Sequence, residues 1–175
     1  MKKLNNKKGI VFWVTGLPGS GKTAIAKKLK KKIEKNYGKS VLFSGDDLRK
    51  ISGFDSYDVK ERIKYAKAYS KLSRNISNQN INVIMATVSL FKEIHTWNRK
   101  NIDNYCEIFI KSKTKEIIKQ KKKKLYFKYK SNLVGIDIKP DFPNKPDILI
   151  VNNFKISIDS LSRTIFKKIN HLYKY

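Results

Sequence analysis

The feature that most constrains the fold of this chain is a short glycine-rich segment that ends in lysine and threonine. It reads Gly16-Leu17-Pro18-Gly19-Ser20-Gly21-Lys22-Thr23 and fits the pattern G-x-x-x-x-G-K-[ST]. An apolar, strand-like run precedes it and a helical pattern follows it, so that backbone N–H groups and a helix N-terminus can both face an anion. The alternative, a glycine-rich turn with a chance lysine, does not explain these flanks. The segment therefore predicts a P-loop that binds ATP or GTP.

Two side chains of this loop carry its expected chemistry. In a P-loop, Lys22 reaches the β- and γ-phosphates, and the hydroxyl of Thr23 ligates Mg²⁺. We expect Lys22 to be exposed at the loop and to contact only phosphates. Residues 16–23 are thus the predicted ATP-binding set, and ATP and Mg²⁺ are the predicted cofactors.

The rest of the chain alternates short apolar runs with helical patterns. Strands are predicted at 11–15, 41–43, 81–86, 105–110 and 148–151, and helices around 25–33, 59–72 and 161–172. Strands that are apolar throughout are typical of a mostly parallel sheet with both faces covered. The sequence therefore predicts an α/β protein, a three-layer P-loop NTPase fold with a five-stranded sheet. We expect residues 1–175 to form a single P-loop kinase domain.

The charge of the chain raises an alternative function. Lys and Arg total 40 against 14 Asp and Glu, a formal net charge of +26, and this permits a basic nucleic-acid-binding NTPase. The excess is almost all lysine, whereas specific readers of phosphates and base edges rely on arginine. We therefore expect no specific nucleic-acid partner. A lone cysteine and the lack of an apolar run of about 18 residues predict a cytosolic protein with no membrane contact.

An acidic segment, GDDLR at residues 45–49, follows the second predicted strand. It lies at the carboxyl end of the sheet, where open α/β sheets bind ligands. There Asp46 can accept a hydroxyl proton and Arg49 can hold a phosphate of the acceptor, while Asp47 is expected to cap a helix that starts near Leu48. The third strand ends without the aspartate of a usual Walker B motif. This pattern favours a compact metabolite kinase over a motor ATPase or signalling GTPase.

Taken together, these motifs resemble those of the adenylyl-sulfate kinase family. The family pattern W-x-T-G-L-x-G-x-G-K, then G-D-x-x-R, L-Y-x-K and G-I-D before a proline-rich loop, runs from Trp13 to Asp137. The resemblance implies an enzyme that uses MgATP to phosphorylate the ribose 3′-hydroxyl of a nucleotide whose 5′-phosphate carries sulfate. It also implies a homodimer and a lysine-rich lid at about 111–135.

The resemblance assigns roles on the acceptor side. It places Asp46 near the 3′-hydroxyl, Phe54 on one face of the acceptor base and Ser89 beside that base. Catalysis is expected from Asp46 and Lys22. The expected acceptor-binding set is Arg49, Phe54, Arg62, Ser89, Leu133, Gly135 and Ile136.

The chain departs from the family pattern on the acceptor side. Arg62 stands where the family has asparagine, and Leu133 stands where it has the second phenylalanine of an aromatic sandwich. Arginine offers several donors and suits a base edge that bears a carbonyl. A branch of the family phosphorylates cytidine diphosphoramidate during capsular polysaccharide modification. We therefore predict cytidine diphosphoramidate as the acceptor; the alternative is adenylyl sulfate, in sulfate activation.

Overall fold

Five parallel strands form one sheet in the computed structural model of the chain, which describes residues 4–5, 7–54, 56, 58–120 and 133–173. The strand order is β2-β3-β1-β4-β5. The strands are β1 (Val11–Gly16), β2 (Ser40–Ser44), β3 (Asn82–Ala86), β4 (Tyr105–Lys111) and β5 (Ile148–Val151). All four neighbouring pairs are parallel. The predicted α/β fold with a five-stranded sheet is confirmed.

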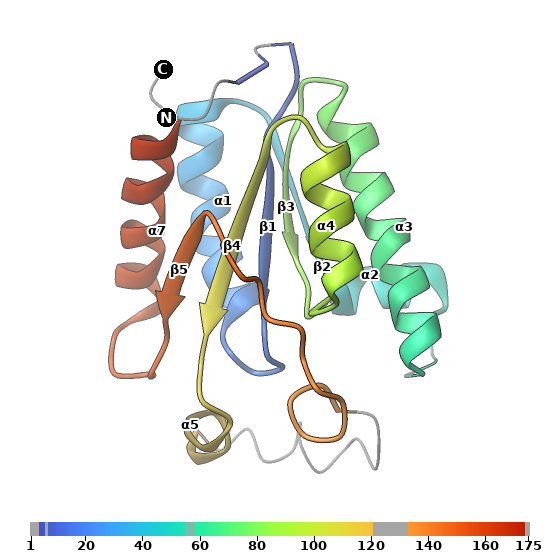
Figure 1. Cartoon of the computed structure of the whole chain (residues 1–175). Helices are drawn as coiled ribbons and strands as arrows, with labels where there is room; N and C mark the ends of the chain where they lie inside the picture. The colour runs from blue at the N-terminus through green and yellow to red at the C-terminus, as the bar shows by residue number, and fades with distance from the viewer. Residues whose placement is uncertain (1–3, 6, 55, 57, 121–132, 174–175) are drawn as a thin grey trace.

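Helices cover both faces of this sheet, as Figure 1 shows. On one face lie α1 (Lys22–Tyr37) and α7 (Ile158–Leu172), and on the other lie α3 (Val59–Ser77) and α4 (Lys92–Asn101). Two shorter helices, α2 (Gly45–Ser52) and α5 (Thr114–Lys119), follow β2 and β4. The sequence patterns identified α1, α3 and α7. They missed α4 and α5, because in α4 only Ile94 is a fully buried aliphatic residue and α5 is too short to show a period.

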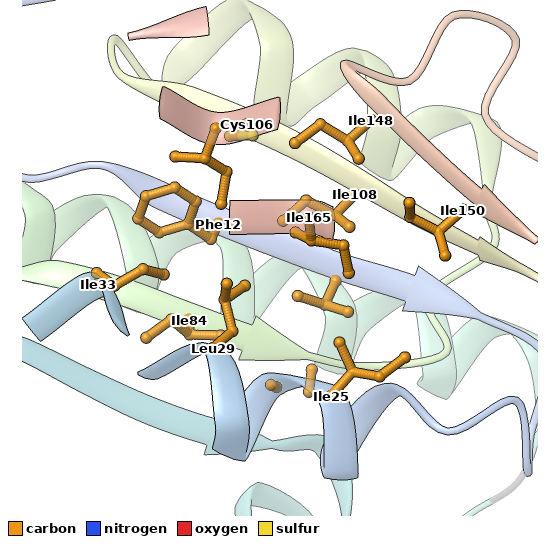
Figure 2. Packing of buried hydrophobic residues seen from close by; sticks show 14 of the residues in the cluster. Phe12, Ile25, Leu29, Ile33, Ile84, Cys106, Ile108, Ile148, Ile150 and Ile165 are labelled. Atoms are coloured by element: carbon orange, nitrogen blue, oxygen red, sulfur yellow. The ribbon is translucent and has the colours of Figure 1, made fainter. Parts of the chain in front are cut away.

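The central strand β1 divides the core between the two faces. Alternate side chains of a strand point to opposite sides. Phe12 packs with Leu29 and Ile165 in the cluster between the sheet and α1 and α7 (Figure 2), whereas Trp13 packs with Ile94 in the cluster under α3 and α4. All six residues of β1 are buried, so the strand that leads into the P-loop is fixed from both sides.

The edge strand β5 differs from the other strands. Ile148 and Ile150 are buried, but Leu149 and Val151 are 44% and 58% exposed. The expectation that every apolar strand is covered on both faces is wrong for β5. The physical reason is its place in the sheet: β5 is the outer neighbour of β4, and it contacts α7 on one face only.

Buried polar contacts fix the segment that leads into β5. The carboxylate of Glu107 on β4 is 2.7 Å from Nδ1 of His95 and accepts a hydrogen bond of 2.7 Å from Arg99. The backbone N–H of Glu107 donates to Asp147 at 2.8 Å, and Nε2 of His95 lies 3.0 Å from the carbonyl oxygen of Asp141. His95 therefore links β4 to the segment before β5. Within the described residues, no helix is long and apolar enough to cross a membrane.

Candidate active site

A cavity of about 360 Å³ lies where β1, β2 and β3 end at their carboxyl termini. The P-loop forms one side, and α2, α3 and the segment after β3 form the other. Its lining residues are Pro18, Gly19, Gly21, Lys22, Thr23, Ala24, Gly45, Asp46, Arg49, Arg62, Tyr65, Tyr69, Ala86, Thr87, Val88, Ser89, Phe91, Leu133 and Val134. The cavity therefore joins the predicted ATP loop to most of the predicted acceptor residues.

The P-loop conformation depends on glycine. Gly21 has a φ of +93°, and a Cβ there would lie 3.0 Å from the side-chain amide nitrogen of Asn152. Only glycine adopts such a backbone angle without strain. The same amide of Asn152 donates a 2.9 Å hydrogen bond to the carbonyl oxygen of Ser20, which ties the loop to the end of β5. The helix α1 starts directly after Gly21, so its first N–H groups lie at the cavity.

The two functional side chains of the loop occupy different environments. Lys22 is only 7% exposed, and its Nζ donates a 2.7 Å hydrogen bond to the carbonyl oxygen of Leu17. The expectation that Lys22 is exposed and contacts only phosphates is therefore wrong. The lysine lines the cavity and also closes the loop on itself, which restricts the position of its ammonium group. Thr23 is partly buried and lines the same cavity.

The two aspartates of α2 have separate roles in the structure. The helix starts at Gly45, three residues earlier than expected, and its N-cap is Ser44 rather than Asp47. The Ser44 hydroxyl accepts a 3.1 Å hydrogen bond from the N–H of Asp47 and donates one of 2.6 Å to its carboxylate. The Ser44 side chain therefore caps the helix, and the Asp47 carboxylate holds the Ser44 hydroxyl in place. Asp46 is exposed and lines the cavity, as do the P-loop residues Lys22 and Thr23.

Four of the seven predicted acceptor-binding residues line the cavity: Arg49, Arg62, Ser89 and Leu133. Nη1 of Arg49 donates to the carbonyl oxygens of Phe54 and Ser56, each at 3.1 Å, and so ties α2 to the loop before α3. The Ser89 hydroxyl lies 2.8 Å from that of Thr87. The arrangement places two guanidinium groups and buried hydroxyls around one space, which suits a phosphorylated ligand.

The other three predicted acceptor residues do not line this cavity. Phe54 stacks on Tyr65 with a centroid distance of 4.0 Å and an interplanar angle of 6°, and it is Tyr65 that lines the cavity. Ile136 is 55% exposed. Gly135 packs against the P-loop, where a Cβ would lie 2.6 Å from Cδ2 of Leu17. Of the expected lid at 111–135, residues 121–132 lie outside the described residues.

Comparison with known proteins identifies the family. A family model described as adenylylsulphate kinase matches residues 8–151. The chain belongs to the adenylylsulphate kinase family. It is 37% identical to the cytidine diphosphoramidate kinase of Campylobacter jejuni over 163 residues, 91% of this chain and 95% of that protein. It is 30% identical to a probable adenylyl-sulfate kinase of Aeropyrum pernix, covering 95% of this chain and 92% of that protein.

A solved structure shows the same fold. The Mycobacterium tuberculosis APS kinase in complex with AMPPNP and APS superposes with a TM-score of 0.82 at 22% identity, covering 93% of this chain and 98% of that one. The three-layer P-loop fold predicted from the sequence is thereby confirmed. As a member of this kinase family the chain is a phosphotransferase that uses ATP.

The sequence patterns missed part of the acceptor side of this kinase. Tyr65 and Tyr69 of α3 line the cavity beside Arg62, and Phe91 does so from the segment after β3. A signal for the tyrosines was present: residues 62, 65 and 69 are three and four positions apart and share one helix face. Phe91 is buried in the core cluster under α3 and α4.

Proposed function

We propose that the chain transfers the γ-phosphoryl group of ATP to the ribose 3′-hydroxyl of a nucleotide 5′-phospho-anhydride, with cytidine diphosphoramidate as the favoured acceptor. The observation that carries this proposal is the single cavity that joins Lys22 and Thr23 of the P-loop to Asp46 and two arginines. The relative from Campylobacter jejuni, a cytidine diphosphoramidate kinase, supports the choice of acceptor. The alternative acceptor is adenylyl sulfate, because the relative from Aeropyrum pernix is a probable adenylyl-sulfate kinase.

In the proposed reaction Asp46 orients the 3′-hydroxyl and takes its proton. The ribose oxygen forms a bond to the γ-phosphorus as the bond between that phosphorus and the β–γ bridging oxygen breaks, which leaves ADP. Lys22 neutralises charge on the β- and γ-phosphates. Its hydrogen bond to Leu17 holds it in place before ATP arrives, so little reorganisation is needed.

Mg²⁺ is the metal that this site would hold. Mg²⁺ prefers hard oxygen ligands and usually binds through one or two protein groups together with substrate phosphates. The Thr23 hydroxyl is such a ligand, at the first turn of α1 and on the cavity wall. When bound, the metal would neutralise charge on the phosphates.

We propose that the acceptor occupies the side of the cavity formed by α2 and α3. Arg49 would pair with the 5′-phosphoryl groups, since arginine forms strong charge-assisted hydrogen bonds with phosphate. Arg62 would donate to the carbonyl of cytosine. Tyr65 would offer its ring to the base and would be backed by Phe54, with which it is already stacked. Ser89 and Leu133 would complete the wall of the base site, and Gly135 with Ile136 would follow at its edge.

Three further points belong to the proposal. Residues 1–175 would form one kinase domain, and the lysine-rich segment at about 111–135 would serve as its lid. The enzyme would be a homodimer that acts in the cytosol, in capsule biosynthesis. Light scattering of the purified protein measures the oligomeric state, and a mass near 20.4 kDa would contradict the dimer.

The function is tested with two acceptors side by side. ADP release with MgATP is measured with cytidine diphosphoramidate and with adenylyl sulfate, and phosphorus NMR locates the new phosphate. We expect 3′-phosphorylated product and a kcat/KM at least about tenfold higher for the cytidine compound, since one lost base contact of 1.4 kcal/mol gives that ratio. A preference for adenylyl sulfate would contradict the acceptor assignment and leave the kinase assignment intact. Binding of duplex DNA that persists at about 150 mM salt would favour the nucleic-acid alternative.

A further inference from the structure

The helix α3 turns three polar side chains towards the cavity. Arg62, Tyr65 and Tyr69 lie on one face of α3 and all line the cavity. Arg62 is the one residue of this face that the family resemblance assigns to the acceptor. The ring of Tyr69 lies 6.5 Å from that of Phe54, next to the stack of Phe54 and Tyr65.

The hydroxyl of Tyr69 differs from those of three other tyrosines, Tyr37, Tyr105 and Tyr173. Tyr69 is 6% exposed, and within the described part of the chain no hydrogen-bond partner reaches its hydroxyl oxygen. By contrast, the hydroxyl of Tyr105 donates to Glu107, that of Tyr173 to the carbonyl of Tyr105, and that of Tyr37 to Asn170. A buried polar group without a partner destabilises the folded state. Such a group on the wall of a substrate cavity indicates a ligand that supplies the partner.

The charges around Tyr69 indicate what this ligand is. Burial raises the pKa of Tyr69 above its usual value of 10; Arg49 lowers the pKa in part, while Tyr65 and Asp46 raise it. The phenol is therefore neutral at physiological pH and can donate a hydrogen bond. Tyr69 and Arg49 line the same cavity, and a donor on the wall that also carries a guanidinium suits an anionic oxygen that the arginine attracts.

We propose that Tyr69 is an acceptor-binding residue whose hydroxyl donates a hydrogen bond to an oxygen of the nucleotide's 5′-phosphoryl group, beside Arg49. The assignment rests on the proposed function, because it takes the acceptor to be a nucleotide with a 5′-phosphate. The hydroxyl oxygen is buried in the free molecule, so this hydrogen bond requires a small movement of the Tyr69 side chain into the cavity as the acceptor binds.

The test is the variant Tyr69→Phe, with Tyr37→Phe as the matched control. Both changes remove one phenol oxygen, but Tyr37 pairs with Asn170 of α7, on the opposite face of the sheet. For Tyr69→Phe we expect the KM for the acceptor to rise about 10- to 100-fold, the size expected for a hydrogen bond to a charged group. The KM for ATP should stay within twofold of the parent value. The melting temperature of the free enzyme should stay the same or rise, because the lost hydroxyl had no partner.

Two acceptors separate the failure of this inference from failure of the proposed function. Cytidine diphosphoramidate and adenylyl sulfate share the 5′-phosphoryl group attached to the ribose and differ in the base and in the outer group on that phosphate, so the rise in KM should be equal for both. An unchanged acceptor KM would overturn the assignment. So would rises that differ more than threefold between the acceptors, because the hydroxyl would then contact the base or the outer group. If the unmodified enzyme prefers adenylyl sulfate, the proposed acceptor is wrong. The effect of Tyr69→Phe on the acceptor KM can then still be measured with adenylyl sulfate.

Discussion

The P-loop side and the acceptor side of the cavity are built in different ways. The P-loop is eight consecutive residues between a strand and a helix, held by contacts such as those of Lys22 to Leu17 and of Asn152 to Ser20. The acceptor side collects single residues from α2, α3, the segment after β3 and residues 133–134. The P-loop side therefore has the local geometry that phosphoryl transfer requires, whereas on the proposed acceptor side one residue can change without the others.

This difference explains where the chain departs from its family pattern. A substitution within residues 16–23 would alter a backbone that must point several N–H groups at phosphates. A substitution at Arg62 or Leu133 changes one wall contact and leaves the phosphate site intact. The following predictions test this division, from the largest expected effect to the smallest.

The variant Lys22→Ala should abolish most of the activity. Loss of the ammonium group removes charge neutralisation on the transferring phosphoryl group, and we expect kcat/KM to fall about 10³-fold in an ADP-release assay. The lost hydrogen bond to Leu17 should also lower the melting temperature by a few degrees. Lys27→Ala, an exposed position on α1, is the control and should leave both quantities unchanged. Turnover that survives in Lys22→Ala would contradict the P-loop assignment.

Asp46→Asn and Asp47→Asn should separate catalysis from helix capping. We expect Asp46→Asn to lower kcat about 10²-fold with little change in the KM for ATP, because a proton acceptor is lost. Asp47→Asn should lower kcat by less than tenfold but destabilise the fold by about 1 kcal/mol, because it weakens the hydrogen bond that holds the N-cap Ser44 hydroxyl. Chemical unfolding measures the second quantity. The opposite order of effects on kcat would show that the two roles are interchanged.

Arg62→Ala should affect the acceptor side alone. Removal of the proposed donor to the base should raise the KM for cytidine diphosphoramidate about tenfold, the usual size of one lost hydrogen bond. The KM for ATP should stay the same, since the P-loop is untouched. Lys60→Ala removes an exposed charge from the same helix and serves as the control for net charge. If both variants raise the acceptor KM equally, the effect of Arg62 is one of charge alone.

Gly135→Ala should have the smallest effect on activity of these variants. It tests the contact between residue 135 and the P-loop. The φ of Gly135 is +94°, and the added Cβ would meet Leu17 of the P-loop. We expect a loss of about 1–2 kcal/mol in unfolding free energy and a twofold to fivefold rise in the KM for ATP. Gly53→Ala is the matched control, since its φ is +63° and nothing lies within 4 Å of the new Cβ. Gly53→Ala should cost only the backbone strain, about 1 kcal/mol, with an unchanged KM.

The sequence alone determined the sheet, its parallel strands and the phosphate site. The strands β1, β3 and β4 are short apolar runs that are almost entirely buried, and the P-loop is a contiguous motif whose spacing fixes its backbone. The sequence also predicted a helix after the acidic segment, with Asp47 as its cap. The identity of the cap was wrong, because Ser44 competes for the same helix start and only the backbone of α2 shows which residue provides it.

Only the tertiary structure decided the composition of the acceptor side and the surroundings of Lys22. Phe54 stacks on Tyr65, and Tyr65 rather than Phe54 lines the cavity. Tyr69 lines it as well, and no hydrogen-bond partner for its hydroxyl lies within the described residues. The exposed face of β5 likewise follows from its place at the sheet edge. The physical reason is the same in each case. These properties depend on packing between elements far apart in the chain, and hydropathy patterns report which residues are buried but not which neighbours bury them.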